Sequence, residues 1–147
     1  MTRFGLFAFF FSMLLSTTGA FAQSKVTWEM LEGVTYIRTM DVVTGRMGIK
    51  PKFSNELKQL SGREILITGY IFPLDSDGTT YALSRYPYAA CFFCGGASVA
   101  SVMDVWLKDL KQRFQLDQIV TLQGTLVLND GGDGLHYLIK DARPVRQ

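Results

Sequence analysis

Two cysteines and one histidine are the residues of this chain whose types and spacing indicate chemistry. The cysteines stand in the segment Cys91-Phe92-Phe93-Cys94-Gly95-Gly96, and His136 follows 42 positions after Cys94. A C-x-x-C pair with a glycine directly after it is typical of a tight turn that directs both thiolates at one ion. Cys91, Cys94 and His136 are therefore candidate metal ligands.

The donor atoms of these three side chains select the kind of ion. Two sulfurs and one imidazole nitrogen favour Zn²⁺, or copper, over Mg²⁺ or Ca²⁺. They fill three positions of a tetrahedron, and the sequence does not dictate the fourth. Its candidates are Asp104, Asp130, Asp133 and water. We expect a zinc site, with copper as the alternative ion.

Two other states of the cysteine pair stay open. A Cys91–Cys94 disulfide suits an oxidising compartment, although closing so short a loop stabilises a fold by only about 2 kcal/mol in the chain-entropy model. With this disulfide, the chain would be an interaction module that binds a protein or a glycan. A redox dithiol would make the chain a thiol oxidoreductase, but thioredoxin-like sites need a βαβ context, and the residues after Cys94 have the pattern of strands.

No catalytic constellation accompanies these residues. A histidine-centred triad has one candidate histidine, His136, and no serine of the chain stands in a Gly-x-Ser-x-Gly elbow. We therefore expect a protein that binds a metal and is not an enzyme.

The elements that must position these side chains are mainly strands. Alternating apolar and polar residues predict five of them, over residues 63–73, 79–85, 102–108, 119–128 and 135–142. The first is long and contains Gly69, which indicates a bulge or a bend. This pattern is typical of a small OB-type β-barrel, with a β-sandwich as the alternative. Closure of the barrel would let the 87–96 loop and the last hairpin meet at one end.

The segment before the barrel is weakly patterned and predicts only short elements. Residues 28–31 favour one helical turn and residues 34–37 favour a strand. A short helix is expected over residues 54–60, with Ser54 as its N-cap.

Residues 1–22 have the layout of a secretory signal peptide. Arg3 is their one charged side chain, an apolar run extends from Phe4 to Leu15, and Ala20-Phe21-Ala22 forms a small-residue end. The run of about twelve residues is short for a spanning helix, which needs roughly 20. We expect residues 23–147 to form a single domain that is exported to an oxidising space such as a periplasm, with no membrane span after cleavage.

The composition excludes two further classes of protein, intrinsically disordered chains and nucleic-acid-binding proteins. The 147 residues are 48% apolar and 19% charged, which is not the composition of a disordered chain. A formal net charge of +2 provides no electrostatic footprint for nucleic acid.

The chain resembles a family of exported bacterial proteins known as domain of unknown function 3299, or DUF3299. The resemblance runs from about Trp28 to Val145 and rests on Leu60-Ser61-Gly62-Arg63, Gly69-Tyr70-Ile71-Phe72-Pro73-Leu74, Ser84-Arg85-Tyr86-Pro87-Tyr88, the cysteine segment extended to Ala97, Val102-Met103-Asp104-Val105 and Leu135-His136-Tyr137. It implies an OB-like barrel and, in some relatives, zinc handling beside an ABC-type transport system. Relatives often carry Gly-Pro-Glu where this chain has Ser98-Val99-Ala100, and Ala100 cannot replace a glutamate ligand.

The leader generates a first prediction. Mass spectrometry of the exported protein should find Gln23 at the N-terminus, because Ala20-Phe21-Ala22 fits the small-residue cleavage pattern. Recovery of an intact Met1 in the membrane fraction would contradict both the cleavage and the assignment of the compartment.

Overall fold

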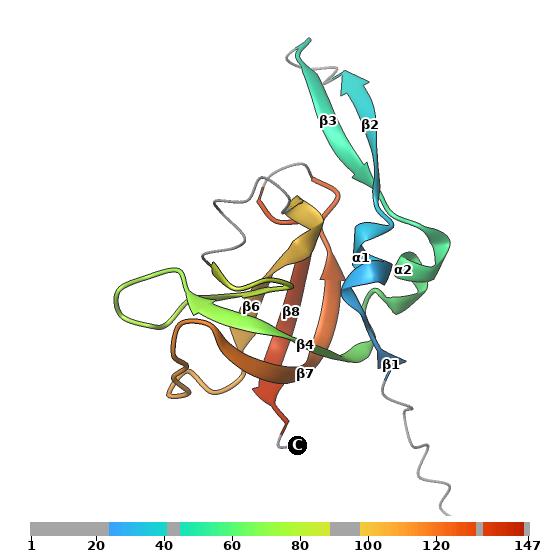
Figure 1. Ribbon diagram of the computed structural model, residues 1–147. Helices are drawn as coiled ribbons and strands as arrows, with labels where there is room; N and C mark the ends of the chain where they lie inside the picture. Colours follow the sequence, from blue (N-terminus) through green and yellow to red (C-terminus); the bar gives the residue numbers. More distant parts are fainter. Residues whose placement is uncertain (1–23, 41–44, 89–97, 132–133, 146–147) are drawn as a thin grey trace, which may run out of the picture.

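Five strands close into a barrel in the computed structural model, which describes residues 24–40, 45–88, 98–131 and 134–145 (Figure 1). They are β4 (Glu64–Pro73), β5 (Tyr81–Ser84), β6 (Val102–Leu107), β7 (Gln118–Leu128) and β8 (Tyr137–Pro144). Their order is β4-β5-β6-β8-β7, and β7 pairs with β4 to complete the circle. The predicted OB-type barrel is confirmed, and closure excludes the β-sandwich.

The strand β4 is shared between two neighbours. Residues 64–71 pair with β7, and residues 70–73 pair with β5, so the strand changes partner near Gly69. A Cβ atom at Gly69 would lie 2.6 Å from the carbonyl oxygen of Ser84 and 3.0 Å from the ring of Trp28. Glycine is therefore required here by the close approach of β5 and of a tryptophan ring.

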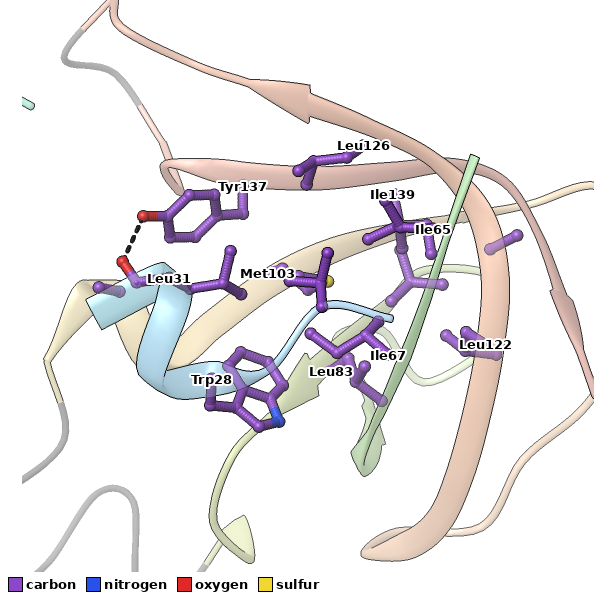
Figure 2. Close-up of a cluster of buried hydrophobic side chains, with 14 of the residues drawn as sticks. Trp28, Leu31, Ile65, Ile67, Leu83, Met103, Leu122, Leu126, Tyr137 and Ile139 are labelled. Carbon is purple, nitrogen blue, oxygen red and sulfur yellow. Dashed lines mark hydrogen bonds between the residues drawn. The ribbon is translucent and has the colours of Figure 1, made fainter. Parts of the chain in front are cut away.

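The barrel interior is filled by the inward-facing residues of each strand. Figure 2 shows Ile65 and Ile67 of β4 packed with Met103, Leu122 and Ile139 from other strands. All five are fully buried. The apolar residues at alternate positions of the sequence are thus the ones on the face of each strand that lines the core.

A short helix, α1 (Trp28–Glu32), covers one end of this core. The side chains of Trp28 and Leu31 point into the cluster (Figure 2), and the indole Nε1 of Trp28 donates a hydrogen bond of 2.8 Å to the carbonyl oxygen of Thr68. The predicted helical turn at residues 28–31 is confirmed. A 3₁₀ turn, η1 (Val99–Ser101), packs against α1.

The second helix, α2 (Asn55–Leu60), begins where the sequence predicts. The side chain of Ser54 accepts a hydrogen bond from the backbone N–H of Leu57, so Ser54 is the N-cap. Leu57 is buried against the barrel core.

Two strands outside the barrel form a projecting ribbon (Figure 1). The strands β2 (Thr35–Met40) and β3 (Met47–Lys52) pair antiparallel in a sheet of their own. The predicted strand at residues 34–37 corresponds to the start of β2, whereas β3 was not expected from the sequence. A short strand, β1 (Ser24–Lys25), pairs in parallel with β4.

The last strand begins later than predicted. β8 spans Tyr137–Pro144, whereas the alternation predicts residues 135–142. The carbonyl oxygens of Leu135 and His136 accept hydrogen bonds from the side chain and the backbone of Asn129. These two residues are therefore held by the preceding turn and not by the sheet.

The predicted signal peptide, residues 1–22, lies outside the described residues. In the part of the chain that the structure describes, no helix is both long and apolar enough to cross a membrane.

The close approach at Gly69 generates a second prediction. Gly69→Ala should lower the free energy of unfolding by about 1–3 kcal/mol, because the new methyl group would push against the β5 backbone. Urea denaturation measures the change. Gly48→Ala in β3 is the control, since its Cβ would meet the side-chain oxygen of Thr39 at an ordinary 3.7 Å. Equal stabilities of the two variants would contradict this account of strand closure.

Candidate metal-binding site

The two cysteines of the predicted site lie outside the described residues, as does Asp133. The connection from β5 to β6 that carries Cys91 and Cys94 is described only at its ends, residues 85–88 and 98–101. The geometry of the site is therefore built from these ends and from the other predicted ligands.

The β5–β6 connection leaves and rejoins the barrel at one place. Ser84, the last residue of β5, pairs with Val102, the first residue of β6. The backbone N–H of Arg85 donates to the carbonyl oxygen of Ser101 at 2.9 Å, which extends the pairing into the connection. Both ends of the connection are thus fixed at the end of the barrel where β6 begins.

His136 lies at this same end of the barrel. β6 and β8 are parallel neighbours, with Asp104 paired to Leu138, so the residues that enter both strands lie at the same end. His136 immediately precedes β8, and its carbonyl oxygen accepts a hydrogen bond of 2.8 Å from the N–H of Asn129. The topology therefore brings the one histidine to the end of the barrel from which the cysteine-bearing connection starts.

The imidazole of His136 is 8% exposed and contacts the ribbon. Its Nε2 lies 3.2 Å from the hydroxyl oxygen of Tyr36 in β2, and the two ring centroids are 5.5 Å apart. Burial lowers the pKa of His136 below its ordinary value of 6.5. The ring is therefore neutral near pH 7, which is the form that binds metals.

The two described aspartates among the predicted fourth ligands, Asp104 and Asp130, lie on different elements. Asp104 is half-buried on β6, where burial raises the pKa of its carboxyl group, and Asp130 is exposed in the β7–β8 connection. Among the described residues, no three His, Cys, Asp or Glu side chains gather closely enough to hold a metal ion. Asp104, Asp130 and His136 thus do not form a site by themselves, and the predicted site depends on the cysteines.

Two interactions hold α1 over this end of the barrel. The hydroxyl of Tyr137 donates a buried hydrogen bond of 2.6 Å to the carbonyl oxygen of Leu31 (Figure 2). The guanidinium of Arg85 binds the carboxylates of Glu29 and Glu32 at 2.6 and 2.5 Å. The start of the β5–β6 connection and the residue after His136 are thus both tied to α1.

The aromatic residues around the connection divide into two groups. Tyr81 and Tyr137 are fully buried in the core, so neither is available to stack on a ligand. Tyr86 and Tyr88 are exposed at the start of the connection, where the backbone N–H of Tyr88 donates to the carboxylate of Asp117. Of these four rings, only those of Tyr86 and Tyr88 are accessible to a ligand.

Tyr36 was missed as a neighbour of the site. The sequence predicts a strand at residues 34–37, but the contact of Tyr36 with His136 spans 100 positions. This contact depends on the direction in which the ribbon leaves α1, and no local sequence pattern predicts that direction.

Strand order and closure define the class of the protein as an OB-type β-barrel with an added antiparallel ribbon. A comparison of the sequence with protein-family profiles and with curated proteins finds no match. Among solved structures, the chain is similar to a DUF3299 family protein from Pseudomonas aeruginosa, with a TM-score of 0.51 and 19% identity. The match covers 86% of this chain and 98% of the other. The resemblance to DUF3299 is thus confirmed at the level of the fold.

The burial of His136 generates a third prediction, on the metal-free protein. The pKa of His136 is lower in the folded state, so the unfolded chain binds more protons and the free energy of unfolding should fall as the pH drops below about 6.5. His136→Gln should flatten this slope in urea titrations between pH 8 and 5.5. The carboxyl group of Asp104 has a raised pKa, so the folded state binds more protons there and this group contributes a pH dependence of the opposite sign to the free energy of unfolding. An unchanged slope in the variant would contradict the assignment to His136.

Proposed function

We propose that the protein is an exported, non-enzymatic metal-binding protein that holds Zn²⁺ through Cys91, Cys94 and His136. One observation carries this proposal. The parallel pairing of β6 with β8 fixes His136 at the end of the barrel where the cysteine-bearing connection leaves and rejoins the sheet. His136 thus lies at the end of the barrel to which residues 85–88 and 98–101, the described ends of that connection, are attached.

The chemistry of the donor set fits the ion. Two thiolates and a neutral imidazole match the preference of Zn²⁺ for sulfur and nitrogen ligands. The lowered pKa of His136 supports the proposal, because a neutral ring needs no proton removed before it binds. Copper has related preferences and is the alternative ion.

The contact between His136 and Tyr36 bears on how the ring would bind. Zinc at Nε2 would displace the Tyr36 hydroxyl, whereas zinc at Nδ1 would keep that hydroxyl as a hydrogen-bond partner on the other side of the ring. Such outer partners commonly fix the orientation and tautomer of a metal-binding histidine. With zinc at Nδ1, Tyr36 would orient the imidazole of His136 without touching the ion.

Three protein ligands leave a fourth position for Asp104, Asp130, Asp133 or water. A position occupied by water stays open to exchange, as it does in catalytic zinc sites, whereas structural sites are closed by four protein ligands. An open site suits a protein that passes its ion on. Together with the resemblance to DUF3299, this supports a role as a zinc-trafficking accessory to a periplasmic, ABC-type transport system.

The proposed ligand set generates a fourth prediction. Cys91→Ser and Cys94→Ser should each abolish stoichiometric zinc binding, because a single thiolate and an imidazole leave half of the tetrahedron empty. His136→Gln should weaken zinc binding strongly, and Tyr36→Phe should weaken it by about 10- to 100-fold if the hydroxyl orients the ring. Calorimetric titration of reduced protein measures all four variants.

Elemental analysis with thiol counting on protein purified anaerobically decides between the states of the cysteine pair. One zinc per chain with two protected thiols is expected, and copper in its place would change the ion but keep the site. An oxidised pair that takes up no metal after mild reduction would contradict the proposal and favour a disulfide-containing interaction module. A reversible dithiol that reduces substrate disulfides would favour a thiol oxidoreductase.

A further inference from the structure

Trp106 is the exposed one of the two tryptophans in this chain, and neither the barrel core nor the proposed metal site uses it. Its side chain is 55% exposed, whereas Trp28 is buried in the core cluster. Met103 and Val105 of β6 are buried in the core, so Trp106 lies on the outer face of that strand. Exposed tryptophan rings are common at binding surfaces. The groups around this ring decide what it could bind.

The strand β8, which lies beside β6 (Figure 1), has one extra residue opposite Trp106. Residues 105–107 of β6 correspond in the register to residues 139–142 of β8. The first and last residues of that β8 segment are buried, whereas Lys140 is half-buried and Asp141 is exposed. The backbone of Asp141 is in the left-handed region, with a φ of 52°. This β-bulge therefore places two consecutive polar side chains on the outer face, beside the indole.

A glycine in β7 makes room for the bulge. Gln123 pairs with Arg143 and Thr125 pairs with Lys140, so β8 has its extra residue relative to β7 as well. A Cβ atom at Gly124 would lie 2.6 Å from the carbonyl oxygen of Lys140. Both neighbouring strands thus accommodate the bulge, which makes it a fixed feature of the sheet. Bulges of this kind often re-aim side chains next to functional sites.

The side chain of Lys140 holds the indole in place. Its Nζ lies over the ring of Trp106, 5.1 Å from the ring centroid. The attraction between the cation and the ring favours one orientation of the indole, and more than half of the side chain still stays exposed. An aromatic surface that is already oriented loses little conformational freedom when a ligand packs on it.

Charges of both signs surround the ring. Asp104 and Lys108 are two residues before and after Trp106 along the chain, which puts them on the same side of β6 and its extension. Lys140 and Asp141 lie across from the ring on β8. Two carboxylates and two ammonium groups are therefore available around the indole.

This balance of charge indicates the kind of ligand. Farther along β8, Arg143 is paired with Glu64 at 2.6 Å, and the flanking outward residues of β5 and β7, Ala82 and Thr125, are uncharged. A polyanion such as nucleic acid requires an excess of cations, which these residues do not provide. A neutral oligosaccharide has an apolar C–H face that packs on an aromatic ring. Its hydroxyl groups donate to carboxylates and accept from ammonium groups.

We propose that the outer face of β6 and β8 binds a neutral oligosaccharide, one sugar ring of which packs on the indole of Trp106. The ammonium group of Lys140 donates to the hydroxyl groups of the sugar, and the carboxylate of Asp141 accepts from them. The proposal goes beyond the metal site and uses neither the cysteines nor His136. Metal-free protein should therefore bind the saccharide as well as the loaded protein does.

NMR titration of metal-free protein tests this proposal. The chain that begins at Gln23 is used, because it contains every described element. Its two indole N–H signals are separate reporters, and Trp106→Phe identifies them by removing one. Chitotetraose, cellotetraose and maltotetraose are the probes. At least one of them should shift the Trp106 signal saturably and leave the signal of Trp28 in place, since the Trp28 N–H is bound to the carbonyl oxygen of Thr68.

Variants at the ring and at the bulge should weaken this binding, followed through the backbone amide signals of β6 and β8. Trp106→Leu should reduce the affinity by about tenfold or more, because the stacking surface is lost. Lys140→Gln/Asp141→Asn should reduce it by about threefold or more, because charge-assisted hydrogen bonds are lost. Asparagine tolerates the positive φ of residue 141, and the dispersion of the amide spectrum shows that each variant is folded.

Matched controls are available on other elements. Ile119→Ala removes an apolar side chain of β7 that is 63% exposed, and Lys58→Gln/Asp77→Asn removes one exposed charge of each sign. Both controls should bind the saccharide like the unchanged protein. Asp104 is left unchanged in every variant, because it is also a candidate zinc ligand.

Four results would overturn the proposal. The first two are the absence of a saturable Trp106 shift with all three saccharides and equal binding by Trp106→Leu. Binding of oligothymidylate without binding of any saccharide would assign the ring to single-stranded nucleic acid. Self-association that Trp106→Leu abolishes, without saccharide binding, would assign it to a second copy of the chain. Unchanged binding by Lys140→Gln/Asp141→Asn alone would overturn the roles given to these two side chains.

Discussion

Closure of the barrel through the pairing of β4 with β7 is the constraint on which the loop positions depend. The register runs from Glu64 opposite Thr125 to Ile71 opposite Gln118, and β4 then continues along β5. Two glycines permit this path. A Cβ at Gly69 or at Gly124 would lie 2.6 Å from a carbonyl oxygen of a neighbouring strand. With the circle closed, the ends of β5, β6 and β8 have fixed neighbours.

The helix α1 transmits this constraint to the ribbon. Leu31 is fully buried, and its carbonyl oxygen is bound by the hydroxyl of Tyr137, so α1 cannot shift without exposing apolar surface and leaving a buried polar group without a partner. The strand β2 starts at Thr35, three residues after α1 ends at Glu32. The direction of the ribbon, and with it the contact of Tyr36 with His136, follows from how α1 is seated.

The sequence predicted the barrel well because its strands each have one face in the core. Ile65, Ile67, Met103, Val105 and Leu122 alternate with outward-facing residues, and that alternation is visible without a structure. The strand β3 lacks such a face, since its side chains other than Pro51 are exposed and it contains both Gly48 and Pro51, which are unfavourable in strands. The candidate ligands were found by residue type and spacing, but their neighbours, such as Tyr36, depend on tertiary structure alone.

The contact between Tyr36 and His136 connects the ribbon directly to the proposed metal ligand. The two rings contact each other between an element outside the barrel and the residue that enters β8. A ligand at His136 that favours one arrangement of this pair must also favour one orientation of the ribbon base. Coupling is reciprocal in free energy, so an interaction that favoured the metal-bound arrangement of Tyr36 would strengthen metal binding at His136 by the same factor. The contact of these two rings would therefore link the position of the ribbon base to metal binding at His136.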